Sequence, residues 1–512
     1  MLLCIDFGNL QFGDIADSRF NNWVFEYFFS ALTNQGNSFK TSNFFYPLIN
    51  NMLFSDNHWF MGIFYSLLRI LKFDHYQSYS IIIIIESILN FVSCYYVLTK
   101  FNLSRKSSAI GAFIFAFNTI IAVKISHSQL HFKAFIPLTI LFIFQYFEKR
   151  DFRYVSYTIL CICLQLIVSS YLGMFLVIYA GIIILTILSN YKINDFKKFL
   201  PQKYYLKTSI LIIILSIIFL LIYALPYYEN INIYNAKIPL TIGLFFELKS
   251  IFISQVSFIY SKLSEYLFLK LPENNGEKNL FLGFGVWIAI FLSFFFKKYH
   301  KNLNFNDKKI FLATSITILF FFLDKYIPTF YFLQLNFSAF GNLRSVNRFF
   351  YVIFFGIIYA VVKFLDFLEK NKSTKNLIIY YFFIFLIIFE AVSIKYEVSN
   401  HKSQEDSIKL YQELAKKYGN DDSILLFTFS ENFNHIQENI NILYAFMWQP
   451  QIKVINGYSG RFYLKLNLAN NCSEAKNIIL ENEKEINKIF NNNFKYDRKK
   501  LVIFHDNKIC EN

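Results

Sequence analysis

The chain has 512 residues, of which 55% are hydrophobic, 21% aromatic and only 17% charged. Soluble domains carry roughly 25% charged residues, so this composition excludes an ordinary soluble globule. The net charge of +15 does not indicate nucleic-acid binding, because the lysines of a membrane protein collect in its cytoplasmic loops. None of the six cysteines has the spacing of a zinc site. Cys472 and Cys510 could pair if their domain lies outside the cytosol.

The first informative stretch is GDIADSRFNNWVFEY (13–27), where two carboxylates precede a helical pattern. Over 20–31, apolar residues recur at i, i+3, i+4, i+7, i+8 and i+11, namely Phe20, Trp23, Val24, Tyr27, Phe28 and Ala31. This spacing makes one apolar helix face, and its aromatic content suits a helix in the membrane interface. Asp14 then fits a helix N-cap and Asp17 a capping-box partner. The alternative is that Asp14 and Asp17 carry chemistry.

A second polar cluster follows in FFYPLINNMLFSDNHW (44–59), where Ser55, Asp56, Asn57 and His58 stand between apolar runs. Ser55 or Asp56 could cap a short apolar helix over 59–71. Two acidic clusters separated by an interfacial helix also make a site more plausible than either cluster alone. Asp56 is therefore a third candidate catalytic carboxylate, and His58 a candidate substrate-binding residue.

Hydropathy predicts ten membrane spans, since a spanning helix needs roughly 20 apolar residues. They cover about 79–98, 108–124, 132–148, 154–169, 173–189, 208–225, 279–296, 310–324, 349–366 and 377–394. The expected fold is therefore an α-helical integral membrane protein with about 10–11 transmembrane helices. Residues 1–78 form a first outer loop with interfacial helices, and 79–395 form the membrane domain.

The distribution of basic residues predicts the orientation. If the loop 100–107 is cytoplasmic, the inner loops also include 148–154, 189–208, 297–309 and 363–375, and together they carry 20 Lys and Arg. The opposite loops, 124–131, 169–173, 226–278 and 325–348, carry 9 although they are longer in total. The positive-inside rule therefore places both acidic clusters and everything after residue 395 on the outer side. Because residues 1–58 must then be outside, we expect an apolar segment encoded upstream in frame.

Two basic stretches lie at this outer boundary. In AVKISHSQLHFK (122–133), Lys124, His127 and His131 lie between two spans, where charged groups are costly unless they line a cavity or the interface. They are candidate substrate-binding residues, or a snorkelling lysine with interface-facing histidines. In SAFGNLRSVNRFF (338–350), Arg344 and Arg348 share a helix face. Guanidinium pairs suit phosphate, and the alternative is anchoring to lipid headgroups.

The segment from 396 to 512 differs in composition and predicts a small outer α/β domain. Helical spacing appears in 406–419 and 471–490, and strands are predicted at 423–429, 452–456 and 500–504. The loop INGYSGRF (455–462) places Tyr458 between two glycines. A structural turn is the default there, with Tyr458 as a candidate substrate-binding residue.

The stretches GDIADSRFNNWVFEY, FFYPLINNMLFSDNHW, HSQLH (127–131) and NGYSG (456–460), with many spans and an outer C-terminal domain, resemble the GT-C superfamily of membrane glycosyltransferases. The likeness is greatest to a group of poorly characterised bacterial proteins of GT-C type. It implies transfer of a sugar from a polyprenyl-phosphate carrier to a glycan, lipid or protein acceptor on the outer face of the bacterial cytoplasmic (inner) membrane.

The resemblance also implies roles for residues. Asp17, and less well Asp14, matches the first-loop acid that acts as general base, whereas Asp56 has no firm counterpart. Basic groups would hold the donor phosphate. No cofactor is certain, although the acidic residues would suit Mg²⁺ or Mn²⁺, which some relatives use. Membrane lipids are expected partners and nucleic acid is not. The alternative function is a membrane transporter or an export component for lipid-linked glycans.

Overall fold

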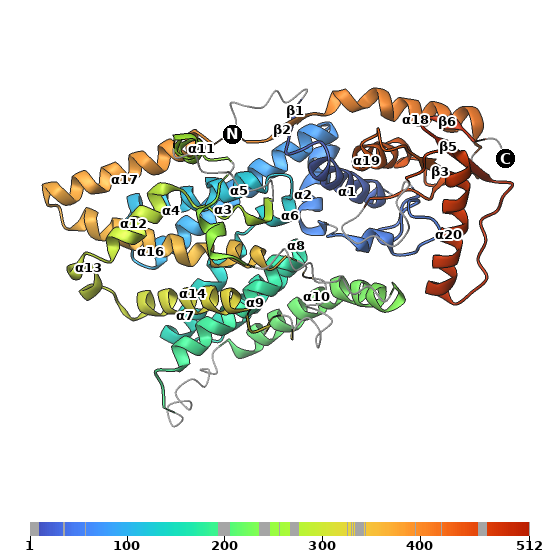
Figure 1. Ribbon diagram of the computed structural model, residues 1–512. Helices are drawn as coiled ribbons and strands as arrows, with labels where there is room; N and C mark the ends of the chain where they lie inside the picture. The colour runs from blue at the N-terminus through green and yellow to red at the C-terminus, as the bar shows by residue number, and fades with distance from the viewer. Residues whose placement is uncertain are drawn as a thin grey trace. The chain divides into compact units, whose positions relative to one another are not determined.

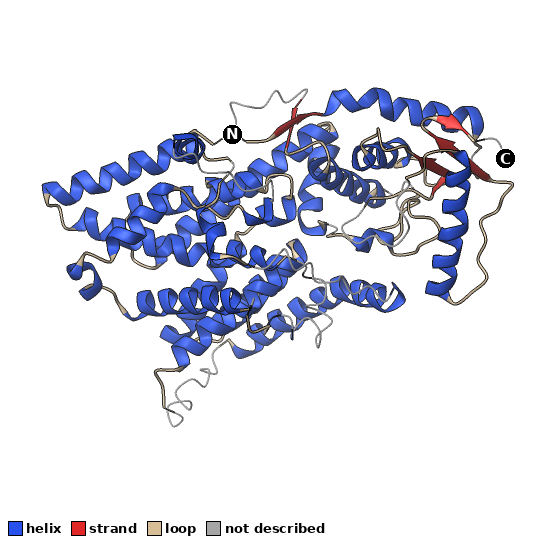
Figure 2. Ribbon diagram, viewed as in Figure 1, coloured by secondary structure: helices blue, strands red, loops and turns tan. Residues whose placement is uncertain are grey.

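The computed structural model describes residues 10–33, 36–56, 58–192, 205–234, 246–254, 256–266, 276–324, 326–328, 330, 332, 343, 345–394, 396–420, 422–458 and 468–510. It is mostly helical, with a small sheet in the C-terminal part of the chain (Figures 1 and 2). The chain divides into two compact units. Unit 1 comprises Met1–Ile82, Tyr223–Lys237 and Val398–Asn512, and unit 2 comprises Ile83–Ile222 and Ile238–Glu397. The first outer loop and the C-terminal domain, expected as separate domains, thus fall in one unit.

Unit 1 joins the two ends of the described chain. Its elements are β1 (Leu10–Phe12), α1 (Asp17–Leu32), η2 (Asn51–Phe54), α2 (Trp59–Ile70), the start of α3 (His75–Lys100), the end of α10 (Leu206–Tyr234), β2 (Val398–Asn400), η8 (His401–Gln404), α18 (Glu405–Tyr418), β3 (Ile424–Thr428), α19 (His435–Phe446), β4 (Lys453–Val454), α20 (Cys472–Phe490), β5 (Leu501–His505) and β6 (Lys508–Ile509). Strand β1 pairs antiparallel with β2, so that Leu10 lies opposite Asn400.

The C-terminal sheet has the order β4-β3-β5-β6. Strand β3 runs parallel to β4 and to β5, and β6 returns antiparallel to β5. All five residues of β3 are buried, as expected for a central parallel strand covered on both faces. The helices and strands predicted after residue 396 are thus present, and α19 is an additional helix that the sequence pattern did not predict.

Helix α1 is buried on nearly all sides, which differs from the expected single apolar face. Its apolar residues Phe20, Trp23 and Tyr27 are buried, and so are its polar residues Asn22 and Glu26. Helices α2 and α19 pack against it. Since the polar face also meets protein, α1 has little surface left for a lipid interface.

Unit 2 is a helical bundle. Its elements are the remainder of α3 and α10, with α4 (Arg105–Phe117), α5 (Thr119–Val123), α6 (Ser128–His131), α7 (Phe135–Lys149), α8 (Arg153–Val168), α9 (Ser170–Leu188), η5 (Leu248–Phe252), α11 (Phe258–Tyr266), η6 (Gly276–Lys278), α12 (Phe284–Ser293), α13 (Lys297–Lys301), α14 (Phe305–Leu323), η7 (Val346–Phe349), α16 (Phe350–Lys370) and α17 (Thr374–Val392).

Seven helical stretches in the described part of the chain are long and apolar enough to cross a membrane. They are His75–Lys100, Arg105–Val123, Ser128–Lys149, Ser170–Leu188, Leu206–Tyr234, Val346–Lys370 and Thr374–Val392. The sequence predicted about 10–11 transmembrane helices, and their number in the whole chain stays a prediction. Helices form at the other three predicted spans, but α8 and α12 have 16 and 10 residues, shorter than a bilayer needs. Helix α14 begins with the charged run Asp307 to Lys309.

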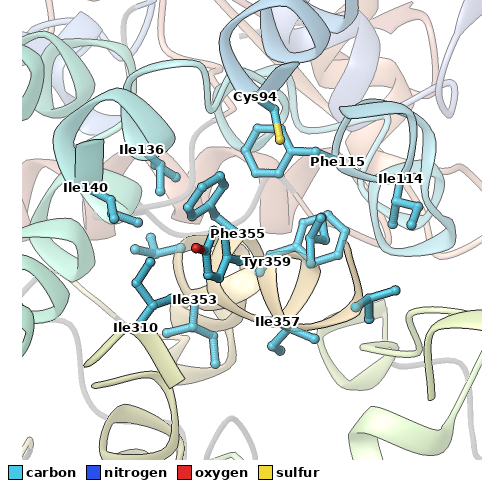
Figure 3. Close-up of a cluster of buried hydrophobic side chains, with 14 of the residues drawn as sticks. Cys94, Ile114, Phe115, Ile136, Ile140, Ile310, Ile353, Phe355, Ile357 and Tyr359 are labelled. Atoms are coloured by element: carbon cyan, nitrogen blue, oxygen red, sulfur yellow. The ribbon is translucent and has the colours of Figure 1, made fainter. Parts of the chain in front are cut away.

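Helix α16 is the central element of unit 2. It packs against α4, α9, α12, α14 and α17, and most of its side chains are buried. Figure 3 shows Ile353, Phe355 and Tyr359 of α16 in one cluster with Phe115 of α4 and Cys94 of α3. Gly111 of α4 permits this approach, because a Cβ there would overlap Val362 and Leu98.

Unit 1 contains a disulfide between Cys472 and Cys510, at the start of α20 and just after β6. The pairing that the sequence left open is thus formed. The bond closes a segment of 38 residues, and restricting the unfolded chain over such a loop stabilises a fold by about 4 kcal/mol in the chain-entropy estimate.

We therefore expect the double variant Cys472→Ser, Cys510→Ser to lose about 4 kcal/mol of unfolding free energy. Pulse proteolysis of the full chain in detergent over a urea gradient measures this loss. Reductant should lower the unfolding midpoint of the wild type and leave the double variant unchanged. Equal midpoints for the oxidised wild type and the double variant would contradict the stabilising role.

Candidate functional site

The start of α1 is held by Asp14. Its carboxylate accepts the backbone N–H groups of Ala16 and Ser18, each at 3.0 Å. The N-cap position itself is Ala16, which has no side-chain cap, so the predicted N-cap at Asp14 is two residues too early, although Asp14 still binds an N–H group of the first helical turn. Asp17 is the first residue of α1, where a carboxylate also interacts favourably with the helix dipole.

Asp17 has a specific partner from the C-terminal part of unit 1. The hydroxyl of Tyr458 donates a hydrogen bond of 2.7 Å to Asp17 Oδ1, and the Tyr458 ring lies edge-on to Phe20 with centroids 5.0 Å apart. Two predicted site residues, 441 positions apart in the chain, therefore meet. The carboxylate is half-buried, so it is neither fully solvated nor sealed in the core.

An aromatic hollow lies beside this pair, within unit 1. It is narrow, with room for about one water molecule, and it is lined by Phe20, Trp23, Val24, Ser42, Phe44, Phe45, Asn51, Met52, Ser55, Leu443 and Tyr458. Such a lining, mostly apolar and aromatic with few polar groups, is typical of small-molecule sites. Tyr458 thus connects the Asp17 carboxylate to the wall of the hollow.

The second acidic cluster lies between η2 and α2. Asp56 is half-buried there. His58 is buried, its Nε2 lies 2.8 Å from Asn21 Oδ1, and its ring is 4.8 Å from that of Phe25. Burial lowers the pKa of His58 to about 3, so the imidazole is neutral and donates to Asn21. Asn21 follows Asp17 by one helical turn, so His58 of the second cluster contacts α1 one turn after Asp17.

In unit 2, two predicted basic residues meet at one carboxylate. Lys124 Nζ lies 2.9 Å and Arg348 Nη2 2.8 Å from Glu277 Oε1. Ser345 donates to Glu277 Oε2 at 2.8 Å, and the Arg348 guanidinium stands 4.4 Å from the centre of the Tyr171 ring. Burial raises the pKa of Glu277, but the charges of Arg348 and Lys124 outweigh it and hold the pKa well below its usual value.

The remaining predicted residues have varied surroundings. His131 contacts Glu86 within unit 2, with 3.2 Å between Nδ1 and Oε2, and His127 is half-buried at the start of α6. Arg344 lies outside the described residues.

Among the residues that the structure describes, no three His, Cys, Asp or Glu side chains group to hold a metal ion, so we derive no step through Mg²⁺ or Mn²⁺.

The sequence analysis missed the acidic members of two partly buried ion pairs, Glu26 and Glu277. In unit 1, Arg69 donates to both oxygens of Glu26, at 2.8 and 2.9 Å, and Tyr65 donates to Glu26 at 2.7 Å. The signal available in the sequence was the position of Glu26, a single acid within an aromatic helical stretch. In unit 2, Glu277 was missed because a single acid in a long loop has no periodic pattern to mark it.

Buried neutral histidines predict acid sensitivity of unit 1. Burial also lowers the pKa of His401 to about 4, whereas unfolded histidines titrate near 6.5. Protons therefore bind preferentially to the unfolded chain, so stability is full above about pH 6.5 and falls as pH decreases towards 4, by about 1.4 kcal/mol per pH unit for each histidine.

We expect His58→Gln to reduce this pH slope, measured as the thermal unfolding midpoint of the full chain between about pH 7.5 and about pH 5. His300→Gln replaces an exposed histidine and should keep the wild-type slope. A His58→Gln variant that is as acid-sensitive as the wild type would show that His58 does not contribute.

Comparison with known proteins identifies a family without an assigned function. The chain matches the family described as a domain of unknown function, DUF6311, over residues 14–389. None of the curated proteins matches the sequence. The match begins at Asp14, at the start of the candidate site, and ends within α17. Because it covers more than half of the sequence, the chain belongs to the DUF6311 family.

Proposed function

We propose that this protein is a membrane glycosyltransferase that moves a sugar from a polyprenyl-phosphate carrier to a glycan, lipid or protein acceptor. The observation that carries the proposal is the half-buried Asp17 carboxylate, bonded to Tyr458 at the wall of an aromatic hollow. A sugar ring has apolar faces that can stack on aromatic side chains, while its hydroxyls need polar partners at the rim.

The proposed reaction uses Asp17 as general base. The carboxylate takes the proton of the acceptor hydroxyl while the acceptor oxygen bonds to the anomeric carbon of the donor sugar. The bond between that carbon and the phosphate oxygen breaks, and the polyprenyl phosphate leaves with the electron pair. The Tyr458 hydroxyl positions the carboxylate. Asp14 supports α1 and Asp56 stays a candidate second acid.

Lys124 and Arg348 of unit 2 stay the predicted residues for the donor phosphate. In the structure both pair with Glu277. Guanidinium and ammonium groups form strong charge-assisted hydrogen bonds with phosphate, and positive charge stabilises the leaving group. Arg344 stays a predicted member of this group.

The protein would lie in the bacterial cytoplasmic membrane with its C-terminal part outside, in a GT-C-like arrangement. The seven long apolar helices support a membrane location. The Cys472–Cys510 disulfide supports an oxidising compartment for the C-terminal part, in agreement with the orientation expected from the basic loops.

The alternative function, transport or export of lipid-linked glycans, has one observation in its favour. Glu86 and Gln165, two polar residues inside predicted spans, both contact the segment His131–Phe132. Polar residues that converge within spanning helices are typical of transporters. Uptake of a labelled lipid-linked sugar by proteoliposomes, without transfer to an acceptor, would favour this alternative.

Asp17→Asn should lower the transfer rate by about 100-fold or more, because general-base catalysis contributes at least that factor. The assay incubates the purified full chain with labelled polyprenyl-phosphate sugars and follows label in the acceptor. The asparagine can still accept the bond from Tyr458. Asp422→Asn, which changes an exposed carboxylate paired with Lys500, should have no effect. Full transfer in both Asp17→Asn and Asp14→Asn would remove the base assignment.

Lys124→Gln should raise the KM for the polyprenyl-phosphate donor by about tenfold, with a smaller change in kcat, because one charge-assisted bond to phosphate is lost. Lys278→Gln is the matched control, since Lys278 also pairs with a carboxylate of unit 2, that of Glu247. An unchanged donor KM in Lys124→Gln would place the phosphate elsewhere.

A further inference from the structure

The helix from Ser128 to Lys149 is interrupted inside unit 2. Helix α6 ends at His131 and α7 begins at Phe135, although the whole stretch is apolar enough to cross a membrane. Irregular backbone at membrane depth persists only where protein buries it or where it lines a cavity. The break between α6 and α7 therefore needs partners from its neighbours.

Side chains of α3 and α8 supply those partners. Asn90 Nδ2 donates to the His131 carbonyl and Asn90 Oδ1 accepts the N–H of Lys133, both at 2.8 Å. Gln165 Nε2 donates to the Phe132 carbonyl at 3.1 Å. A single asparagine thus bonds both sides of the break, which fixes His131 and Lys133 relative to α3.

Three ionisable side chains meet at this break, each at most 2% exposed. They are Glu86, His131 and Lys133. The Glu86 carboxylate lies 3.2 Å from His131 Nδ1, and Lys133 Nζ stands over the rings of Phe115 and Phe354, at 5.1 and 5.6 Å. Lys133 acts electrostatically on Glu86, His131 and the thiol of Cys94.

Several polar atoms of this group lack a partner. His131 Nε2, Lys133 Nζ and Gln165 Oε1 are buried and make no hydrogen bond to any residue that the structure describes. A buried polar atom normally has a partner, which can be water or a ligand. These three atoms belong to α6, to the break and to α8. Buried polar atoms without a hydrogen-bond partner thus lie on both sides of the break.

We propose that Glu86, His131 and Lys133 form a buried proton-binding centre at the break between α6 and α7. A proton moves between groups within hydrogen-bond reach, and the Glu86–His131 contact has this geometry. The proton adds to the Glu86 carboxylate or to a nitrogen of His131, and no other bond changes. Chains of acidic residues and histidines serve as proton relays in membrane proteins.

The chemistry of the group favours a proton over a metal ion. Glu86 and His131 supply two potential ligands, and the ammonium group of Lys133 would repel a divalent cation. The other elements at the break contribute Asn90, Gln165, Phe115 and Phe354, which do not titrate, and the thiol Cys94. This centre is independent of the Asp17 site and of glycosyl transfer.

The test is infrared difference spectroscopy of the full chain in nanodiscs, titrated between about pH 4 and about pH 9. We expect a band of a protonated, buried carboxyl group that appears on acidification and is lost in Glu86→Gln. The glutamine keeps the size of the side chain and an oxygen facing His131. In Lys133→Met, which retains the packing against Phe115, the titration midpoint should shift by about one pH unit or more.

Glu390→Gln is the matched control. Glu390 is a buried glutamate of unit 2 that accepts the backbone N–H groups of Phe284 and Gly285, so its replacement should leave the Glu86 band in place. The proposal is overturned if the band persists in Glu86→Gln or if its midpoint is unchanged in Lys133→Met. The second variant decides the matter on its own if Glu86→Gln does not fold.

Discussion

The polar side chains of α1 are enclosed by protein, and a buried polar group must find a hydrogen-bond partner. Arg19, fully buried, donates to Asn441 at 2.9 Å and stacks on Tyr444. Asn21 meets His58, and Glu26 meets Arg69. The packing of unit 1 depends on these bonds, because they connect α1 to α2, to the loop before α2 and to α19. The candidate base Asp17 is held at the start of the same helix.

Local patterns in the sequence predicted the elements well. Every predicted span coincides with a helix, because an apolar run is a local property. Among the described helices at those spans, α8 and α12 are short and α14 starts with charged residues, so the number of spanning helices stays a prediction. The strands at 424–428 and 501–505 followed from their β-branched and aromatic residues.

The contacts that build the candidate site could be predicted only in part. The pairing of Asp17 with Tyr458 joins two residues that the sequence had selected separately, but nothing in the pattern connects them. The polar residues of α1 looked exposed in the sequence. Partners such as Asn441 could not be recognised, because they lie more than 400 residues further along the chain. No sequence pattern marked Glu277 as a partner of Lys124 and Arg348. Long-range contacts between single residues have no periodicity, and their recognition needs the folded chain.

The distance along the chain between α1 and α19 also has a consequence for synthesis. Arg19 and Asn441 are 422 residues apart, and β1 pairs with β2 across a similar separation. Ribosomes add roughly 5–20 residues per second, so α1 waits tens of seconds for its partners on α19. During that interval Arg19 lacks Asn441, whereas Glu26 can already pair with Arg69 of α2. The helices of unit 2 can insert into the membrane during this interval, and the core of unit 1 forms only after Val398–Asn512 has been synthesised.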